Sequence, residues 1–267
     1  DSLKLTQRSL LYKSLAKTLE QRIYNRIKRS IKATDLVDLS LIRAAGPNAS
    51  QVFEFAGQGA STPVIRGFFT NNGYRKVFLE RLDDSVSQLV PEESWVLGVS
   101  PDVIRGDGFE DEVAARATRL YLEDFIKAYE SWLTTLNLVP STNLEQSIRQ
   151  ARILAAVDSP LGALLRTISQ ETALKDPNKE GSRSLVDKAI EEKKEELLDI
   201  IEPGLSNTLE RSREEAIDPE ELVRDRFADI RRMVTGQPSP MDEVNKLINE
   251  HYLYLLSLDS SLKVRSG

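Results

Sequence analysis

Apolar residues recur at every fourth position over long stretches of the chain, and this spacing constrains the fold more than any other feature. Leucine or isoleucine stands at each fourth position from Leu15 to Ile31, while lysine and arginine occupy the other faces. Such a stripe predicts an amphipathic helix over residues 3–31 that packs against a partner surface. Glycine (13) and proline (11) are few for 267 residues, which argues against a strand-rich fold. We therefore predict a mainly α fold, an elongated multi-helix bundle with an irregular middle segment and at most short strands.

Further helices are predicted from their start signals. The pairs Ser159-Pro160, Asp218-Pro219 and Ser239-Pro240 each combine a capping side chain with a proline that has no amide to satisfy. Asn143 and Gln146 have the spacing of a capping box. With the apolar periodicity, these signals predict helices over residues 70–89, 110–137, 143–156, 160–173, 182–201, 205–215, 219–234 and 240–257.

The middle of the chain breaks the helical period. Residues 52–55 (Val-Phe-Glu-Phe) alternate as in a short strand, and residues 57–63 and 98–108 are rich in loop-forming residues. We predict an N-terminal helical region over 1–140 and a C-terminal helical subdomain over 141–267, or one continuous domain. A turn-prone stretch near residues 176–181 is an alternative boundary.

The net charge of −6 is unevenly distributed. Residues 1–32 carry nine basic and two acidic residues, a net +7, which leaves −13 for the rest of the chain. A basic helix of this kind can dock on nucleic acid or anionic lipid, or it can pack on the acidic body. Its few aromatic residues offer little stacking surface for nucleic acid, which favours packing.

The residue types needed for most catalytic centres are scarce. The chain has no cysteine and one histidine, which excludes thiol nucleophiles, Cys-ligated metals and sites with two histidines. Gly57 and Gly59 fit the start of a phosphate-binding loop, but Thr62 replaces its third glycine and no Walker lysine follows. His251 is expected to pack on the apolar face of the last helix. We expect no catalytic residue, cofactor or metal, and a carboxylate hydrolase is the weaker alternative.

An aromatic turn in the middle of the chain is the most unusual local feature. Residues 67–74 place three aromatic side chains and two glycines around a polar turn. Thr70 is expected to cap a helix that runs to about Leu89, with Phe78 on its buried side. Pro91 is expected to end that helix, and Trp95 then becomes a buried anchor.

The stretch from Gly67 to Leu79 resembles a motif of the IcmF-like (TssM) family, the large inner-membrane proteins of bacterial type VI secretion. That motif reads approximately Gly-x-(Phe/Tyr)-Thr-x-x-Gly-Tyr-x-x-Val-Phe-Leu. A Glu-Glu-x-Trp-Val-Leu-Gly element follows and corresponds to residues 92–98. Shorter similarities lie at 121–125, 138–140, 158–161, 223–227 and 233–236. The family-motif residues, to which we assign structural roles, are Gly67, Phe69, Thr70, Gly73, Tyr74, Val77, Phe78, Leu79, Trp95, Gly98, Asp158, Ser159, Pro160 and Leu161.

The resemblance implies a location and a set of partners. The chain is similar to the periplasmic helical portion of an inner-membrane protein, and we expect it to be a piece of a longer chain. The family's partners are an outer-membrane lipoprotein, a smaller inner-membrane protein and copies of itself. We do not expect this part to contact the lipoprotein directly, because the family uses a β-rich terminal domain for that. The leading hypothesis is a non-enzymatic scaffold that binds no nucleic acid; the alternative is a regulatory module whose basic helix docks on anionic lipid or nucleic acid.

Overall fold

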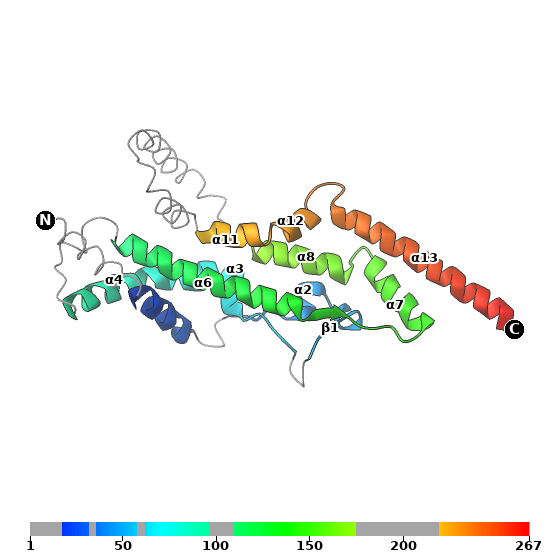
Figure 1. Cartoon of the computed structure of the whole chain (residues 1–267), viewed down its shortest axis with the longest axis horizontal. Helices are drawn as coiled ribbons and strands as arrows, with labels where there is room; N and C mark the ends of the chain where they lie inside the picture. Colours follow the sequence, from blue (N-terminus) through cyan, green and yellow to red (C-terminus); the bar gives the residue numbers. More distant parts are fainter. Residues whose placement is uncertain (1–17, 32–35, 58–61, 97–108, 175–218, 267) are drawn as a thin grey trace, which may run out of the picture.

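The computed structural model describes residues 18–31, 36–57, 62–96, 109–174 and 219–266. Within these ranges the chain forms an elongated, mainly helical body, as predicted, with its N-terminal and C-terminal parts at opposite ends (Figure 1). The sheet described there is a short antiparallel pair of strands. The helices predicted over 182–201 and 205–215, the loop over 98–108, and Gly98 lie outside the described residues.

The first half begins with a helix over residues 18–30, the described part of the predicted basic helix. Its stripe is buried at Leu19, Ile23 and Ile27. The chain then forms α2 (Leu41–Ala45), η1 (Ala49–Gln51), β1 (Phe53–Phe55), η2 (Gly67–Phe69), α3 (Asn71–Gly73), the π-helical turn η3 (Tyr74–Phe78) and α4 (Leu79–Val96).

Helix α4 differs from the prediction at its C-terminal end. The helix passes through Pro91 and ends at Val96, so Pro91 does not terminate it. A proline inside a helix removes one backbone hydrogen bond but leaves the rest of the ladder, and Glu92 and Glu93 after it favour helix. Trp95 therefore belongs to the last turn of α4, and its predicted role as a buried anchor lies outside what the structure describes.

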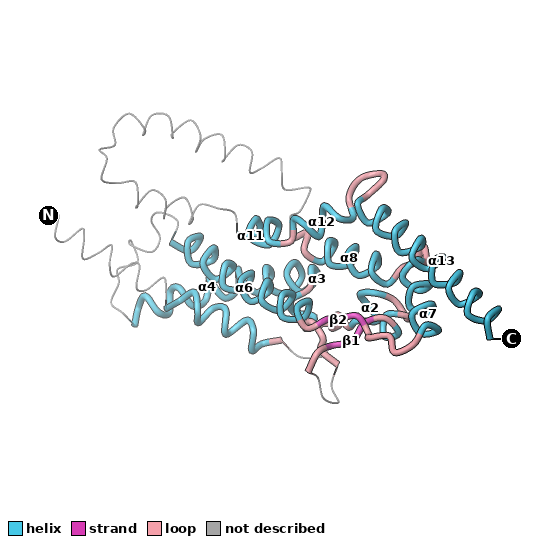
Figure 2. Tube along the Cα trace, turned by 45° about the vertical axis from the view of Figure 1, so that its right-hand side comes forward, coloured by secondary structure: helices cyan, strands magenta, loops and turns pink. Residues whose placement is uncertain are grey.

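Helix α6 (Phe109–Thr134) is the central element, and its nearest neighbours lie on several sides (Figure 2). Its buried side chains include Tyr121, Phe125 and Tyr129, each fully inaccessible to solvent. The prediction extended this helix to residue 137 and was wrong there. Leu136–Leu138 form β2, which pairs antiparallel with β1 so that Phe53 lies opposite Leu138. The predicted strand over 52–55 is thus confirmed.

The second half contains α7 (Leu144–Ala155), α8 (Pro160–Glu171), α11 (Pro219–Arg226), α12 (Ala228–Val234) and α13 (Pro240–Ser266). The single helix predicted over 219–234 is divided at Phe227, whose backbone leaves the helical region and whose side chain is buried against Tyr129. Helix α13 continues nine residues beyond the predicted end at 257, because no glycine or proline interrupts residues 258–266.

One hydrophobic core joins most of these elements. It takes side chains from the helix over 18–30, the segment around η2 and η3, α4, α6, α8 and α11. Leu164 and Ile168 of α8 contribute from beyond residue 140, as do Val223 and Phe227. The division into regions 1–140 and 141–267 stays a prediction.

Candidate functional site

The family motif from Gly67 to Leu79 forms a compact turn that leads into α4. Thr70 caps the first helical turn, as predicted: its hydroxyl accepts a hydrogen bond from the Gly73 amide (3.2 Å) and donates one to the Gly67 carbonyl (2.6 Å). These two bonds tie the start of the turn to its end. Because Thr70 is itself buried, removing its hydroxyl would take away the side-chain acceptor of the Gly73 amide, whereas the Gly67 carbonyl would keep its bond from the Thr70 amide.

Both motif glycines lie where there is no space for a side chain. A Cβ atom at Gly73 would be 2.3 Å from the Gly67 carbonyl oxygen and 2.4 Å from that of Phe68. At Gly67 it would be 2.7 Å from Leu36 Cβ. These neighbours include backbone atoms that cannot rotate away. Glycine is therefore needed at both positions, because another part of the main chain passes too close for a side chain.

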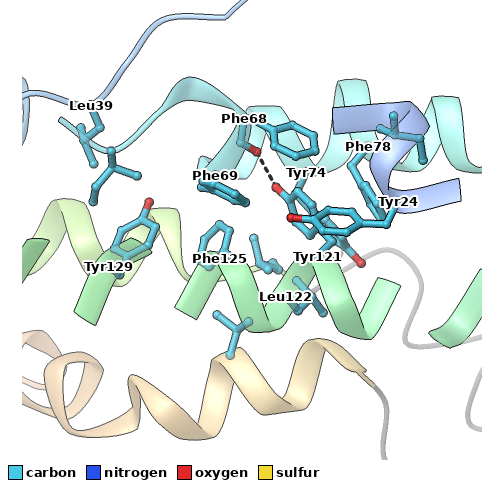
Figure 3. Close-up of a cluster of buried hydrophobic side chains, with 14 of the residues drawn as sticks. Tyr24, Leu39, Phe68, Phe69, Tyr74, Phe78, Tyr121, Leu122, Phe125 and Tyr129 are labelled. Carbon is cyan, nitrogen blue, oxygen red and sulfur yellow. Dashed lines mark hydrogen bonds between the residues drawn. The ribbon is translucent and has the colours of Figure 1, made fainter. Parts of the chain in front are cut away.

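Six rings pack around this turn and form what we call the aromatic cluster (Figure 3). The ring of Tyr121, on α6, is at its centre: its centroid lies 4.2 Å from that of Phe78 and 4.9 Å from that of Phe68. The Tyr121 hydroxyl donates a 2.5 Å hydrogen bond to the Phe68 carbonyl. Stacked and edge-to-face pairs of this kind add to the hydrophobic stabilisation of a core. The cluster comprises Phe68, Phe69, Tyr74, Phe78, Tyr121 and Phe125.

The buried phenols next to the motif are unsuited to proton transfer. Burial raises the pKa of Tyr121 well above its usual value, and neighbouring tyrosines raise it further. Burial, and then the charge of Glu171, likewise raise the pKa of Tyr129. Both side chains therefore stay neutral at physiological pH. Among the described residues, the Tyr129 hydroxyl has no hydrogen-bond partner. Its ring fills space in the core, but burying the unpaired hydroxyl costs folding free energy.

Polar contacts fasten the turn to its neighbours. The Gly67 amide donates to the Asp38 carboxylate (2.8 Å), and the Asn71 amide donates to Glu171 at the end of α8 (2.7 Å). The Tyr74 hydroxyl donates to Glu220 of α11 (2.8 Å). The contact with Asp38 spans 29 positions in sequence, and the other two span 100 and 146. The motif is thus one of the places where the first and second halves of the chain are held together, as α2 with α8 and α6 with α11 are others.

A second set of contacts holds the basic helix over 18–30 on α6. The Asp124 carboxylate accepts hydrogen bonds from the Tyr24 hydroxyl (2.6 Å) and the Lys28 ammonium (2.9 Å). Burial opposes the charged form of Asp124, but these two bonds and the charge of Lys28 outweigh it and lower the pKa of Asp124. Lys28 also lies over the rings of Tyr24 and Phe69. Part of the basic helix is therefore neutralised by the body, as the packing interpretation predicts.

The other motif residues are placed less uniformly. Val77 and Leu79 are half-buried beside Phe78, on the η3–α4 segment. Residues 158–161, one of the shorter similarities to the family, form the corner between α7 and α8. Pro160 starts α8 as predicted, but Ser159 does not cap it: its hydroxyl is buried and has no partner. Asp158 is exposed, and Leu161 is half-buried against the core.

The capping predictions at Ser239 and Asn143 are confirmed, while Asp218 lies outside the described residues. At the start of α13, the Ser239 hydroxyl accepts from the Asp242 amide (3.3 Å), while the Asp242 carboxylate accepts from the Ser239 amide (2.8 Å). Asn143 caps α7 by accepting from the Gln146 amide. These ends are stabilised without any ligand, so they serve the fold.

Among the described residues, α13, which carries His251, lies at the opposite end of the molecule from the acidic first turn of α6 (Figure 1). His251 is exposed on α13, and its predicted packing is wrong, because the buried face of that helix runs through Met241 and Leu255 instead. Glu110 and Asp111 lie in the first turn of α6, where they suit the helix dipole. Across the described part of the chain, no group of three acidic or histidine side chains could hold a metal ion. No described helix is long and apolar enough to cross a membrane.

Sequence reasoning missed the polar partners of the motif. Asp38, Glu171 and Glu220 each accept a hydrogen bond from it, yet all three stand among ordinary surface-type residues. Trp132 was expected on α6, but its bond to the Pro63 carbonyl (3.1 Å) and its edge contact with Phe55 were not. A carboxylate that caps a distant turn has no local sequence signal.

A family model and a curated relative point to the same group of proteins. Residues 3–173 match the family described as "IcmF-related: Intracellular multiplication and human macrophage-killing". A curated relative, "Type VI secretion system component TssM1" of Pseudomonas aeruginosa, is 29% identical over 248 residues, which are 89% of this chain and 22% of the relative. The chain thus spans about a fifth of that protein's length. A solved "Type VI secretion system membrane core complex" chain aligns over 82% of this chain and 36% of its own, with 19% identity and a TM-score of 0.42.

Proposed function

The chain belongs to the IcmF-related family, and from this premise we propose that it is a non-enzymatic scaffold segment of a type VI secretion membrane complex. It would act in the periplasm through protein–protein contacts. Its helices would fix the distance between the parts of a larger protein and present surfaces to other subunits. The name of the curated relative supports the secretion system as the setting.

The observation that carries this proposal is that the motif residues serve packing and backbone geometry. Gly67 and Gly73 allow two close backbone contacts, Thr70 joins them, and Phe69, Tyr74 and Phe78 are buried in the aromatic cluster. Residues that serve a reaction need access to a substrate, whereas these residues are covered. The motif therefore supports a role in maintaining shape. We assign the same role to the corner at residues 158–161.

The proposed partners are the other subunits of the complex. They are an outer-membrane lipoprotein, a smaller inner-membrane protein and further copies of this chain. Because family resemblance assigns lipoprotein binding to a separate β-rich domain, we propose that this segment supports that contact without making it. No nucleic acid or cofactor has a part in this function.

The basic helix provides the one observation that favours a second function. Arg22, Arg26 and Arg29 line a surface hollow on the helix over 18–30, and such a surface could attract anionic lipid. Against this, the apolar stripe of the helix is buried and Lys28 is bound to Asp124. Lipid docking predicts vesicle binding that weakens steeply with salt, whereas the scaffold function predicts none.

Site-specific photo-cross-linking in cells tests the proposed function. A photoreactive residue is placed at exposed Val157 or Tyr254, or at buried Phe78 as a matched control, in the full-length protein of a secreting bacterium. The exposed positions should form adducts with subunits of the membrane complex in the envelope fraction, and the buried position should form none. Adducts only with proteins outside the complex would contradict the proposal.

A secretion assay tests the absence of catalysis. Glu110→Gln and Asp111→Asn remove exposed groups that could act as acids or bases and should leave effector secretion unchanged. Gly73→Ala carries no chemistry but should abolish secretion, because the turn cannot form. If the acidic-residue variants abolished secretion and Gly73→Ala did not, a reactive centre would be identified and the scaffold interpretation overturned.

A further inference from the structure

Two apolar side chains hold α11 (Pro219–Arg226) against α6, beside which it runs (Figure 1). Val223, in the middle of α11, is fully buried. Phe227, four residues later, is 3% exposed, and its ring meets that of Tyr129 edge-on with the centroids 5.8 Å apart. The remaining residues of α11 are exposed or half-buried. The helix is therefore attached to the body along a single narrow face.

A polar contact near each end fixes the position of α11 along α6. Near its start, Glu220 accepts a hydrogen bond from the Tyr74 hydroxyl (2.8 Å). At its last residue, Arg226 forms an ion pair with Glu130 of α6. We call the surface formed by Tyr74, Tyr129 and Glu130 the α11 seat. It combines residues of the motif turn with residues of the central helix.

The contacts of α11 have the spacing of one face of a helix. Glu220, Val223 and Phe227 follow one another in steps of three and four, and Arg226 precedes Phe227 directly. Proteins that bind an amphipathic helix in a groove contact anchors at i, i+3, i+4 and i+7 in the same way. The α11 seat therefore selects a set of side chains in a fixed order: a carboxylate, an aliphatic group, a cation and an aromatic ring.

The seat and its occupant come from separate parts of the chain. Residues 3–173, which match the family, contain the whole seat, whereas α11 begins at Pro219. α11 has eight residues, and an isolated helix shorter than about 12–15 residues is marginal in water. It therefore depends on the seat for its helical form, as does a segment that folds when it binds.

We propose that the α11 seat is a helix-binding site and that α11 is its exchangeable ligand. Five of the eight residues of α11 are charged, so its release exposes little apolar surface of its own. Release also leaves the aromatic cluster intact, because none of the six rings of that cluster belongs to α11. The vacated site takes an amphipathic helix of another protein that carries the same four side chains. This inference goes beyond the proposed scaffold function, because it assigns a binding site.

In the intact chain, α11 protects the seat from competing helices. The chain joins α11 to its own seat, which gives it an effective concentration of about millimolar order there. A free helix of the same sequence should therefore bind the intact chain poorly. A substitution that removes α11 from the seat should make the site available.

Binding of a labelled peptide tests this arrangement. A fluorescent peptide of residues 218–230 is titrated with the 267-residue chain, either unchanged or carrying Val223→Asp, which places a charge at the buried position. The Val223→Asp chain should bind the peptide at least about tenfold more tightly, because its own α11 no longer competes. Asp225→Ala, at an exposed position of α11, is the control and should bind as weakly as the unchanged chain.

A charge swap determines whether the peptide occupies the seat. Glu130→Arg in the Val223→Asp chain should weaken binding by about threefold or more, because Arg226 of the peptide then meets a cation. A peptide with Arg226→Glu should restore the affinity for this chain. A peptide with Phe227→Ala lacks the aromatic anchor and should bind neither chain measurably.

Three results overturn the proposal. Equally weak binding by the unchanged and the Val223→Asp chains, both folded by circular dichroism, would show that the seat does not take a separate helix. Binding that ignores the charge swap would place the peptide elsewhere. Hydrogen exchange of the unchanged chain decides if the Val223→Asp chain does not fold.

In that measurement, the amides of α11 should exchange through a local opening, before those of α6 around Tyr129. Simultaneous exchange of the two helices would show that α11 is a fixed part of the core. Because the scaffold function is measured by secretion in cells, its failure and the failure of this binding are distinguishable.

Discussion

The aromatic cluster and the pair of helices α7 and α13 are built in opposite ways. The cluster buries Tyr74, Phe78, Tyr121 and Phe125 almost completely and belongs to the main hydrophobic core. The helix pair adds no fully buried residue to that core, although Ile153 and Leu154 of α7 pack against it, and α13 leaves several large apolar side chains exposed. The family-motif residues from Gly67 to Leu79 lie in or next to the first region. We infer that the first region preserves the shape of the body and the second makes contacts with other proteins.

Phe78→Ala should produce the largest change in stability. Phe78 is fully buried and touches the rings of Phe68, Tyr74 and Tyr121. Loss of its ring should cost about 3–5 kcal/mol of unfolding free energy, from lost burial and an unfilled cavity. Urea denaturation measures the change. Leu247→Ala on α13 is the matched control and should shift stability by less than about 0.5 kcal/mol; equal effects would remove the distinction between the two regions.

Gly73→Ala should be nearly as damaging, although it adds only one methyl group. The added Cβ would meet two backbone oxygens at 2.3 and 2.4 Å, so the turn must open. We expect a loss of about 3 kcal/mol in thermal or urea unfolding. Asn72→Ala, one residue earlier at an exposed position, should be close to neutral. A stable Gly73→Ala chain would show that the motif glycine does not serve packing.

Two tyrosine-to-phenylalanine changes should act in opposite directions. Tyr121→Phe removes the 2.5 Å hydrogen bond to the Phe68 carbonyl and should destabilise the chain by about 1–2 kcal/mol. Tyr129→Phe removes a buried hydroxyl that has no partner and should be neutral or stabilising by about 1 kcal/mol. Differential scanning calorimetry of both variants compares them directly. Similar losses from the two would contradict the assigned role of the Tyr121 hydroxyl.

The contact between the basic helix and α6 should make the free energy of unfolding depend slightly on pH in acid. The pKa of Asp124 is lower in the folded chain than its usual 3.8, so its contribution to stability is complete above that value. The contribution is lost as the pH falls through the lower, folded-state pKa. Asp124→Asn should therefore flatten the loss of stability below about pH 4. Glu145→Gln, which breaks an exposed pair with Arg149, serves as control, and an identical acid profile for both would contradict the assignment.

The sequence predicts the parts of this fold that depend on local signals. The apolar period locates α6 and the basic helix, and capping residues such as Asn143 and Ser239 mark helix starts to within a residue. Thr70 and Phe78 likewise have the predicted cap and burial.

The rest depends on contacts between distant segments. Leu136 enters a strand because β1 pairs with it across more than 80 residues, and Phe227 leaves its helix to pack on Tyr129. His251 was expected to pack on the apolar face of the last helix, but the body covers only the strip that includes Met241 and Leu255, and the sequence does not say how wide that strip is. The sequence also gives no signal for the carboxylates that accept hydrogen bonds from the motif, such as Glu171.

Native-state hydrogen exchange of the 267-residue chain tests most directly whether the motif turn is the rigid part of the body. The Gly73 amide is bound by Thr70 Oγ1 and the Tyr74 amide by the Thr70 carbonyl, both inside the core. They should exchange only through global unfolding, while amides of α13 around Tyr254 exchange earlier through local opening. Rapid exchange at Gly73 and Tyr74 together with full protection of α13 would contradict this account.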